Sequence, residues 1–142
     1  MLILLAACLL ADPVPVYIIA GQSNAEGYGV PHAPLETIDE VTVVWPGRSQ
    51  GENAGPLRTG WGANEKMIGP EYGFGQEIQR HHLSPVVLLK TAWGGKDVWC
   101  DFRSTSAGDF NWAERQMKAR EEREGRSREV GSFFRAMVNN VK

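Results

Sequence analysis

The chain has 142 residues, of which 42% are apolar and 23% charged, which is ordinary for a single globular domain. Lys and Arg number 15 against 17 Asp and Glu, so the formal charge is -2. This balance argues against nucleic acid as a partner, because nucleic-acid-binding domains usually carry a basic excess. The two cysteines, Cys8 and Cys100, predict neither a disulfide framework nor a zinc site.

The first ten residues are apolar throughout, and the run breaks at Asp12-Pro13. The run is too short to span a bilayer, and no other segment predicts a spanning helix. It is similar to the apolar core of a secretory signal, and Leu5-Ala6-Ala7-Cys8 is similar to a lipoprotein acylation box. We therefore expect a signal peptide or lipoprotein leader over residues 1–12, export of the protein, and one domain over 13–142. A buried first strand is the alternative.

The residues from Val16 to Ala20 predict a strand that stops at Gly21. Ser23 follows between the amide side chains of Gln22 and Asn24. Because catalytic groups in open α/β sheets lie beyond the carboxyl ends of such strands, Ser23 is a candidate nucleophile. The alternative is ordinary turn chemistry, in which Ser23 or Asn24 caps the next helix.

The middle of the chain predicts an alternation of strands and a helix. Residues 27–34 read as a loop, 41–45 as a second strand, and 48–67 as a long surface loop. A helix is expected from Pro70 to about residue 82, with Phe74 and Ile78 on its apolar stripe. A third strand covers 85–90. Strand, helix and strand in this order predict a parallel crossover.

The last third predicts two further helices. Asn111 is placed to cap a helix from Trp112, which Gly125 weakens. The segment 115–129 has so few apolar residues that we expect a solvated face or a loose excursion. Ser132 is placed to cap a final helix, whose apolar face carries Phe134, Met137, Val138 and Val141.

Three glycine-rich motifs do not meet the requirements of known signatures. Gly73-Phe74-Gly75 lacks the third glycine of a dinucleotide site, and Gly94-Gly95-Lys96 lacks the flanks of a phosphate loop. The run 21–25 differs from a Gly-x-Ser-x-Gly elbow only at Ala25. It follows the first strand, however, which disfavours a distant α/β-hydrolase.

Three ordered blocks together resemble the SGNH-type carbohydrate esterases, and more closely the sialate O-acetylesterase and acetylxylan esterase group. The blocks are Ile19-Ala20-Gly21-Gln22-Ser23-Asn24, Ile68-Gly69-Pro70-Glu71-Tyr72-Gly73-Phe74-Gly75 and Lys90-Thr91-Ala92-Trp93-Gly94-Gly95-Lys96. Residues 101–103 and 130–134 also look familial. The resemblance covers roughly residues 14–142.

The resemblance implies a three-layer α/β/α fold with a parallel sheet, and a serine hydrolase that removes O-acetyl groups from an acetylated sugar or polysaccharide. It implies no cofactor and no metal. Ser23 would be the nucleophile, and the backbone N–H groups of Ser23, Gly94 and Gly95 would form the oxyanion hole. Gln22, Asn24 and Trp93 would contact the substrate.

The chain departs from these esterases because it lacks the Trp-x-Gln-Gly block and the final Asp-x-x-His that supply the base. Its histidines are His32, His81 and His82. His81 and His82 suit a helix end, and His32 is a weak candidate base. We therefore expect the front part of an esterase domain whose C-terminal part is missing, weakly active or inactive, with self-association through an uncovered sheet edge.

A carbohydrate-binding pseudoenzyme is the second hypothesis. Trp45, Trp61, Trp93 and Trp99 offer flat faces on which a sugar ring could stack. The alternative for these side chains is core packing, because tryptophan is highly buried on average.

Overall fold

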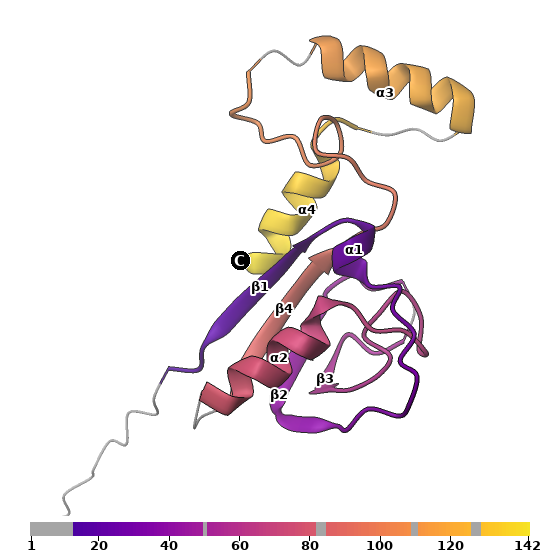
Figure 1. Cartoon of the computed structure of the whole chain (residues 1–142). Coiled ribbons are helices and arrows are strands. Elements are labelled where there is room, and N and C mark those ends of the chain that lie inside the picture. The colour runs from indigo at the N-terminus through magenta and orange to yellow at the C-terminus, as the bar shows by residue number, and fades with distance from the viewer. Residues whose placement is uncertain (1–12, 50, 82–84, 109–110, 126–128) are drawn as a thin grey trace, which may run out of the picture.

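A computed structural model describes residues 13–49, 51–81, 85–108, 111–125 and 129–142 (Figure 1). The expected leader over 1–12, its acylation box and His82 lie outside these ranges. Within them, no helix combines the length and the apolarity needed to cross a membrane.

A four-stranded sheet forms the centre, with strands in the order β1 (Val16–Gly21), β4 (Val86–Ala92), β2 (Ile38–Val44) and β3 (Ala54–Leu57). β4 pairs in parallel with both β1 and β2, while β3 is antiparallel to β2. The α/β class is confirmed, as are the three expected strands. β4 runs two residues beyond its expected end, so Lys90 lies inside the sheet.

The region 48–67 is not a surface loop, as the sequence had predicted. It contains β3 and the side chain of Trp61, which is 1% exposed and whose indole N–H donates to the Pro56 carbonyl at 2.7 Å. Pro56 has no N–H to donate, and such a residue is tolerated on an edge strand. Among the described residues this Ala-Gly-Pro-Leu run pairs with β2 alone, and four residues are too few for a periodic pattern to predict a strand.

Helices lie on both faces of the sheet. α2 (Pro70–His81) packs against β2, β3 and β4, and α4 (Ser132–Val141) packs against β4. On β4 the neighbours Lys90 and Thr91 bond to α2 and α4 respectively, through Glu71 at 2.7 Å and Asn140 at 3.3 Å. Because adjacent strand residues point to opposite faces, the two helices cover opposite faces and the arrangement has three layers.

The buried face of α2 differs from the expected stripe. Phe74 is 40% exposed and meets Tyr17 edge-on at 5.4 Å, whereas Glu71, Tyr72 and Gly75 are buried. A Cβ on Gly75 would lie 2.5 Å from Leu57 Cδ2, so the glycine lets the helix approach the sheet closely.

Ser132 is not the cap of α4 (Ser132–Val141) but its first residue, because Gly131 holds the N-cap position. Asn111 is the first residue of α3 (Asn111–Glu124). The first amides of α4 are satisfied by a backbone group instead, because Phe133 and Phe134 N–H donate to the Asp101 carbonyl at 3.1 and 3.3 Å. α3 ends before Gly125, which has a positive φ of 63°.

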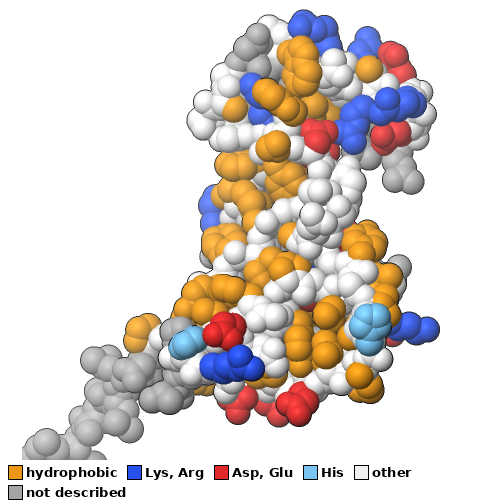
Figure 2. Space-filling model, in the orientation of Figure 1, with side chains coloured by type: hydrophobic (Ala, Val, Ile, Leu, Met, Phe, Trp, Pro, Cys, Tyr) orange, Lys and Arg blue, Asp and Glu red, His pale blue; other side chains and the backbone are white. Residues whose placement is uncertain are grey.

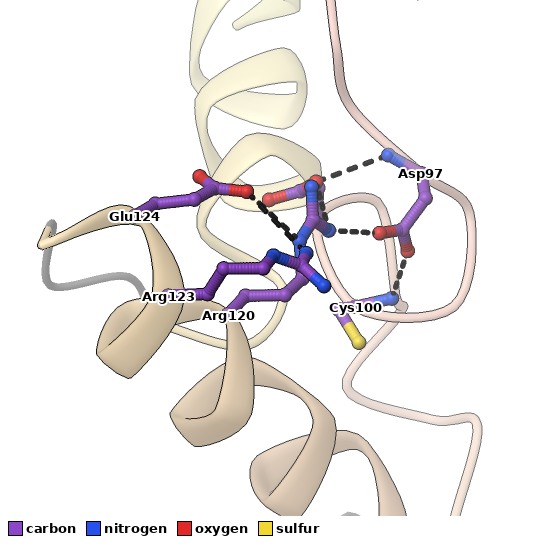
Figure 3. Close-up of polar contacts among 6 residues, drawn as sticks. Asp97, Cys100, Arg120, Arg123 and Glu124 are labelled. Atoms are coloured by element: carbon purple, nitrogen blue, oxygen red, sulfur yellow. Dashed lines mark hydrogen bonds and ion pairs between the residues drawn. The ribbon is translucent and has the colours of Figure 1, made fainter.

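α3 is attached to the segment that follows β4 (Figure 3). Arg120 of α3 pairs with the carboxylates of Asp97 and Asp101, and Met117 packs with Cys100 and Val130. Asp97 Oδ1 accepts the Cys100 N–H at 2.7 Å, so the same carboxylate also shapes the turn. This cluster of charged and apolar side chains attaches α3 to the segment that follows β4.

β1 has no strand on its outer side among the described residues. Its Ile18 pairs with Leu89, which places Ile18 and Val16 on the face that carries α4, yet they are 51% and 57% exposed. Figure 2 shows hydrophobic side chains gathered over the middle of the molecule, where it narrows below the α3 excursion. An apolar edge strand is therefore open to solvent.

Candidate functional site

The carboxyl ends of β1 and β4 lie side by side. Gly21 pairs with Ala92 at the last position of the ladder, and the Trp93 N–H donates to the Gly21 carbonyl at 3.1 Å. The turn that begins with Gln22 and the turn that contains Gly94 and Gly95 therefore leave the same edge of the sheet. Each block directly follows an apolar strand, as the sequence indicated, and the pairing of β1 with β4 brings the two turns to this edge.

Ser23 is the first residue of α1 (Ser23–Glu26), a single helical turn. Its Oγ donates to Gln22 Oε1 at 2.7 Å, and the side chain is half-buried. No side chain caps the amino end of α1, so the capping role considered for Ser23 or Asn24 was wrong. The Gln22 amide instead fixes the direction of the hydroxyl, while Asn24 is exposed beside it.

Gly94 and Gly95 meet different constraints. Gly95 has a φ of +68°, a backbone conformation that favours glycine, and open space around its missing Cβ. A Cβ on Gly94 would lie 2.4 Å from Glu26 Oε2 and 3.0 Å from the Tyr28 hydroxyl. A side chain at position 94 would therefore displace the Glu26 carboxylate and the Tyr28 hydroxyl from their present positions.

Glu26 and Tyr28 are site residues that the sequence analysis missed. The Tyr28 hydroxyl donates to Glu26 Oε2 at 3.0 Å, and this hydrogen bond to a carboxylate raises the pKa of Tyr28. Glu26 lies three residues after Ser23 on α1, and that spacing was the available signal.

Trp93 anchors the glycine turn against α4. Its ring meets Phe133 of α4 at 5.2 Å in an edge-on contact and Phe102 at 6.1 Å. The side chain is half-buried, so part of it faces solvent.

An open pocket of about 500 Å³ lies between the Ser23 turn and the start of α2. Its lining residues are Ser23, Asn24, Gly27, Tyr28, Gly29, Ile68, Gly69 and Pro70. A smaller hollow nearby, of about 50 Å³, is lined in part by Glu26, Trp45, Arg48 and Trp93. Both are hollows that open beside the two turns.

Arg48 supports the smaller hollow. Its guanidinium stacks on Trp45 and Trp61, 5.1 and 5.3 Å from the ring centroids, and donates to the Gly60 and Gly62 carbonyls. Burial is the main cause that lowers the pKa of Arg48. The backbone contacts show that this cation holds the 60–62 segment in place.

No imidazole hydrogen-bonds to Ser23 within the described ranges. His32 is exposed and lines a separate pocket with Arg58 and Thr59, while His81 Nε2 pairs with Glu77 at 3.1 Å. The same ranges hold no cluster of three His, Cys, Asp or Glu side chains suited to a metal ion.

The tryptophans fall into two groups. Trp45 and Trp61 are 3% and 1% exposed and belong to the core, so they offer no stacking face. Trp99 is 63% exposed and meets Trp112 of α3 at 5.4 Å. Of the four candidates, Trp99 leaves the most ring surface available.

Comparison with known proteins gives one match. Residues 13–130 match the family model described as carbohydrate esterase, sialic acid-specific acetylesterase. No curated protein and no solved structure gives a significant match.

Proposed function

Because the chain belongs to the carbohydrate esterase family of sialic acid-specific acetylesterases, we propose that it removes O-acetyl groups from sugars with Ser23 as nucleophile. The observation that carries the proposal is the adjacency of the Ser23 turn and the Gly94-Gly95 turn at one edge of the sheet. Nucleophile and backbone donors need this adjacency to meet at one acyl carbonyl.

The Ser23 hydroxyl attacks the acetyl carbonyl, and the backbone N–H groups of Ser23, Gly94 and Gly95 receive the oxyanion. Each such donor contributes about 3–4 kcal/mol of transition-state stabilisation. The sugar leaves with the proton that Ser23 released, and water then hydrolyses the acetyl-serine. Asn24 and Trp93 contact the sugar, while Gln22, placed with them by resemblance, also orients the hydroxyl through its 2.7 Å bond.

No histidine in the described part of the chain is placed to act as the general base for Ser23. His32 is exposed, with no hydrogen bond to Ser23 in the described part of the chain. A serine without a base is a weak nucleophile at neutral pH. We therefore expect the 142-residue chain alone to turn over very slowly or undetectably.

Hydrolysis of an activated acetyl ester and of O-acetylated sialic acid and xylan tests this proposal. The expected result is a very slow or undetectable rate, unchanged by His32→Ala, together with an Asp-x-x-His block encoded downstream of Lys142. Expression with that block should restore a rate that Ser23→Ala abolishes. Ordinary enzyme rates from the short chain, lost in His32→Ala, would show that His32 is the base.

A carbohydrate-binding pseudoenzyme is the second candidate, and exposed Trp99 beside Trp112 is the observation that favours it. Titration of tryptophan fluorescence with acetylated and deacetylated sugars separates the two. Binding that Trp99→Ala removes, with no hydrolysis even after the downstream block is added, would support the pseudoenzyme.

Export through the residue 1–12 leader is a further part of the proposal. Expression of the full coding sequence followed by mass spectrometry of the amino terminus tests it. Processing before residue 13, or lipid on Cys8, is the expected result, and an intact cytoplasmic chain would contradict export.

A further inference from the structure

Lys90 and Glu71 form a fully buried ion pair between β4 and α2. The Lys90 Nζ to Glu71 Oε2 distance is 2.7 Å, and both side chains are 0% exposed. Burying two charges costs several kcal/mol per ion, and an apolar pair of similar volume often stabilises a fold as well or better. Packing alone therefore gives no reason for charges at this position.

The ammonium group of Lys90 uses its three donors on three separate segments. Besides Glu71, it donates to the carbonyls of Glu26 at 2.8 Å and Trp61 at 2.5 Å. The Trp45 ring lies 4.4 Å from the nitrogen. Since a lysine has only three donors, none remains for a substrate, and Lys90 is excluded as a catalytic group.

The Glu26 carbonyl is the end of the Ser23 turn. α1 has only four residues, and its last carbonyls lack partners within the helix. A helix that short does not hold its shape without tertiary contacts. Lys90 supplies such a contact at one end of α1, while Gln22 and Ser23 lie at the other.

Glu71 holds the opposite wall of the Ser23 pocket. Its Oε1 accepts the Gly69 N–H at 2.6 Å, and Gly69 lines the pocket with Ser23. The two walls touch, because a Cβ on Gly27 would lie 2.3 Å from Gly69 Cα. One ion pair therefore links both sides of the pocket to the central strand.

We infer that Lys90 and Glu71 are positioning residues, which fix the Ser23 turn against the Gly69 wall without touching the substrate. The inference rests on the proposed function for its catalytic meaning. Its structural part, the selective ordering of residues 23–27, stands independently.

Amide hydrogen exchange on the full chain tests the ordering. In Lys90→Met, protection at Glu26 and Gly27 should fall at least about tenfold more than at Leu88 and Leu89, the effect of one hydrogen bond of about 1.4 kcal/mol. The matched control, Val43→Ala, removes core packing but none of these hydrogen bonds. It should lower protection evenly, and an even loss in Lys90→Met as well would overturn the inference.

A second readout follows the reactivity of Ser23 toward a fluorophosphonate. Its rate should fall about tenfold in Lys90→Met, if the lost hydrogen bond is worth about 1.4 kcal/mol, and stay unchanged in Val43→Ala. Both rates are measured in the chain expressed with the downstream block, because a serine without a base reacts slowly. An unreactive Ser23 in that longer chain would count against the proposed nucleophile, while the exchange data would still decide whether Lys90 and Glu71 order residues 23–27.

Glu71→Gln keeps the side-chain volume and serves if Lys90→Met does not fold. It should lower amide protection at Glu26 and Gly27 in the same way, but by a smaller factor.

The unmodified chain adds a measurement that needs no variant. Its Lys90 ammonium protons should exchange with water slowly enough to be seen by NMR. Rapid exchange would contradict a buried, fully hydrogen-bonded Lys90–Glu71 pair.

Discussion

Replacement of the buried Gly27 by alanine should destabilise the protein strongly, and more than the same replacement at a glycine with open space around it. Gly27 has a φ of +91°, and an added Cβ would lie 2.3 Å from Gly69 Cα and 2.5 Å from Gly69 N. The left-handed backbone costs alanine about 1–2 kcal/mol. The overlap with backbone atoms adds about 1–3 kcal/mol of overpacking, so the expected loss is about 2–5 kcal/mol.

Two matched variants isolate these contributions. Gly47 has a φ of +70° but nothing within 4 Å of its missing Cβ, so Gly47→Ala should cost only the backbone part, about 1–2 kcal/mol. Gly73 lies inside α2 with open space around it, and Gly73→Ala should stabilise by about 0.5–1 kcal/mol.

Urea unfolding at low protein concentration, followed by tryptophan fluorescence, measures all three variants. The buried Trp45 and Trp61 make the emission sensitive to loss of the core. A loss in Gly27→Ala no larger than in Gly47→Ala would refute the tight contact between the Ser23 turn and Gly69.

Burial raises the pKa of the Cys100 thiol, with neighbouring carboxylates adding to it. With the other cysteine replaced, alkylation of Cys100 should therefore stay slow at pH 8. Stability should fall once pH passes the thiol pKa of the unfolded chain, which ionises first; labelling at the rate of a free thiol would contradict this. Arg120→Met removes the pairs with Asp97 and Asp101, so thermolysin should cut α3 faster with little change in the Tm of the sheet, and equal cutting rates would count against this anchor. Ile18→Lys places a charge on the open edge strand and should reduce self-association in sedimentation experiments; unchanged association would locate the contact elsewhere.

The continuous apolar strands and the glycine and proline boundaries of α2 were predictable because they are local. The expected strands at 16–20 and 85–90 correspond to β1 and to β4, which covers Val86–Ala92, and α2 begins at Pro70 as expected. That the Ser23 turn and the Gly94-Gly95 turn each directly follow a strand was predictable from the same local patterns.

The features that sequence reasoning missed depend on contacts between distant residues. Lys90 looks like the polar end of a strand, and only its partner Glu71, 19 positions earlier, allows it to lie at 0% exposure inside the sheet. β3 could not be predicted for a similar reason. A strand that contains Pro56 is tolerated at the edge of a sheet, and only the structure shows that β3 is the edge strand of the described sheet.

The pairing of β1 with β4 has a consequence for the order of folding. Val16 pairs with Val87, so the first strand meets its partner in the described sheet only after about 70 further residues have been made. At a synthesis rate of about 5–20 residues per second, β1 has no partner strand for roughly 4–14 s. β2 and β3 are close in sequence and can pair earlier, since closing a short loop is fast. We therefore expect the serine turn, which follows β1 directly, to become ordered only after β4 has been made.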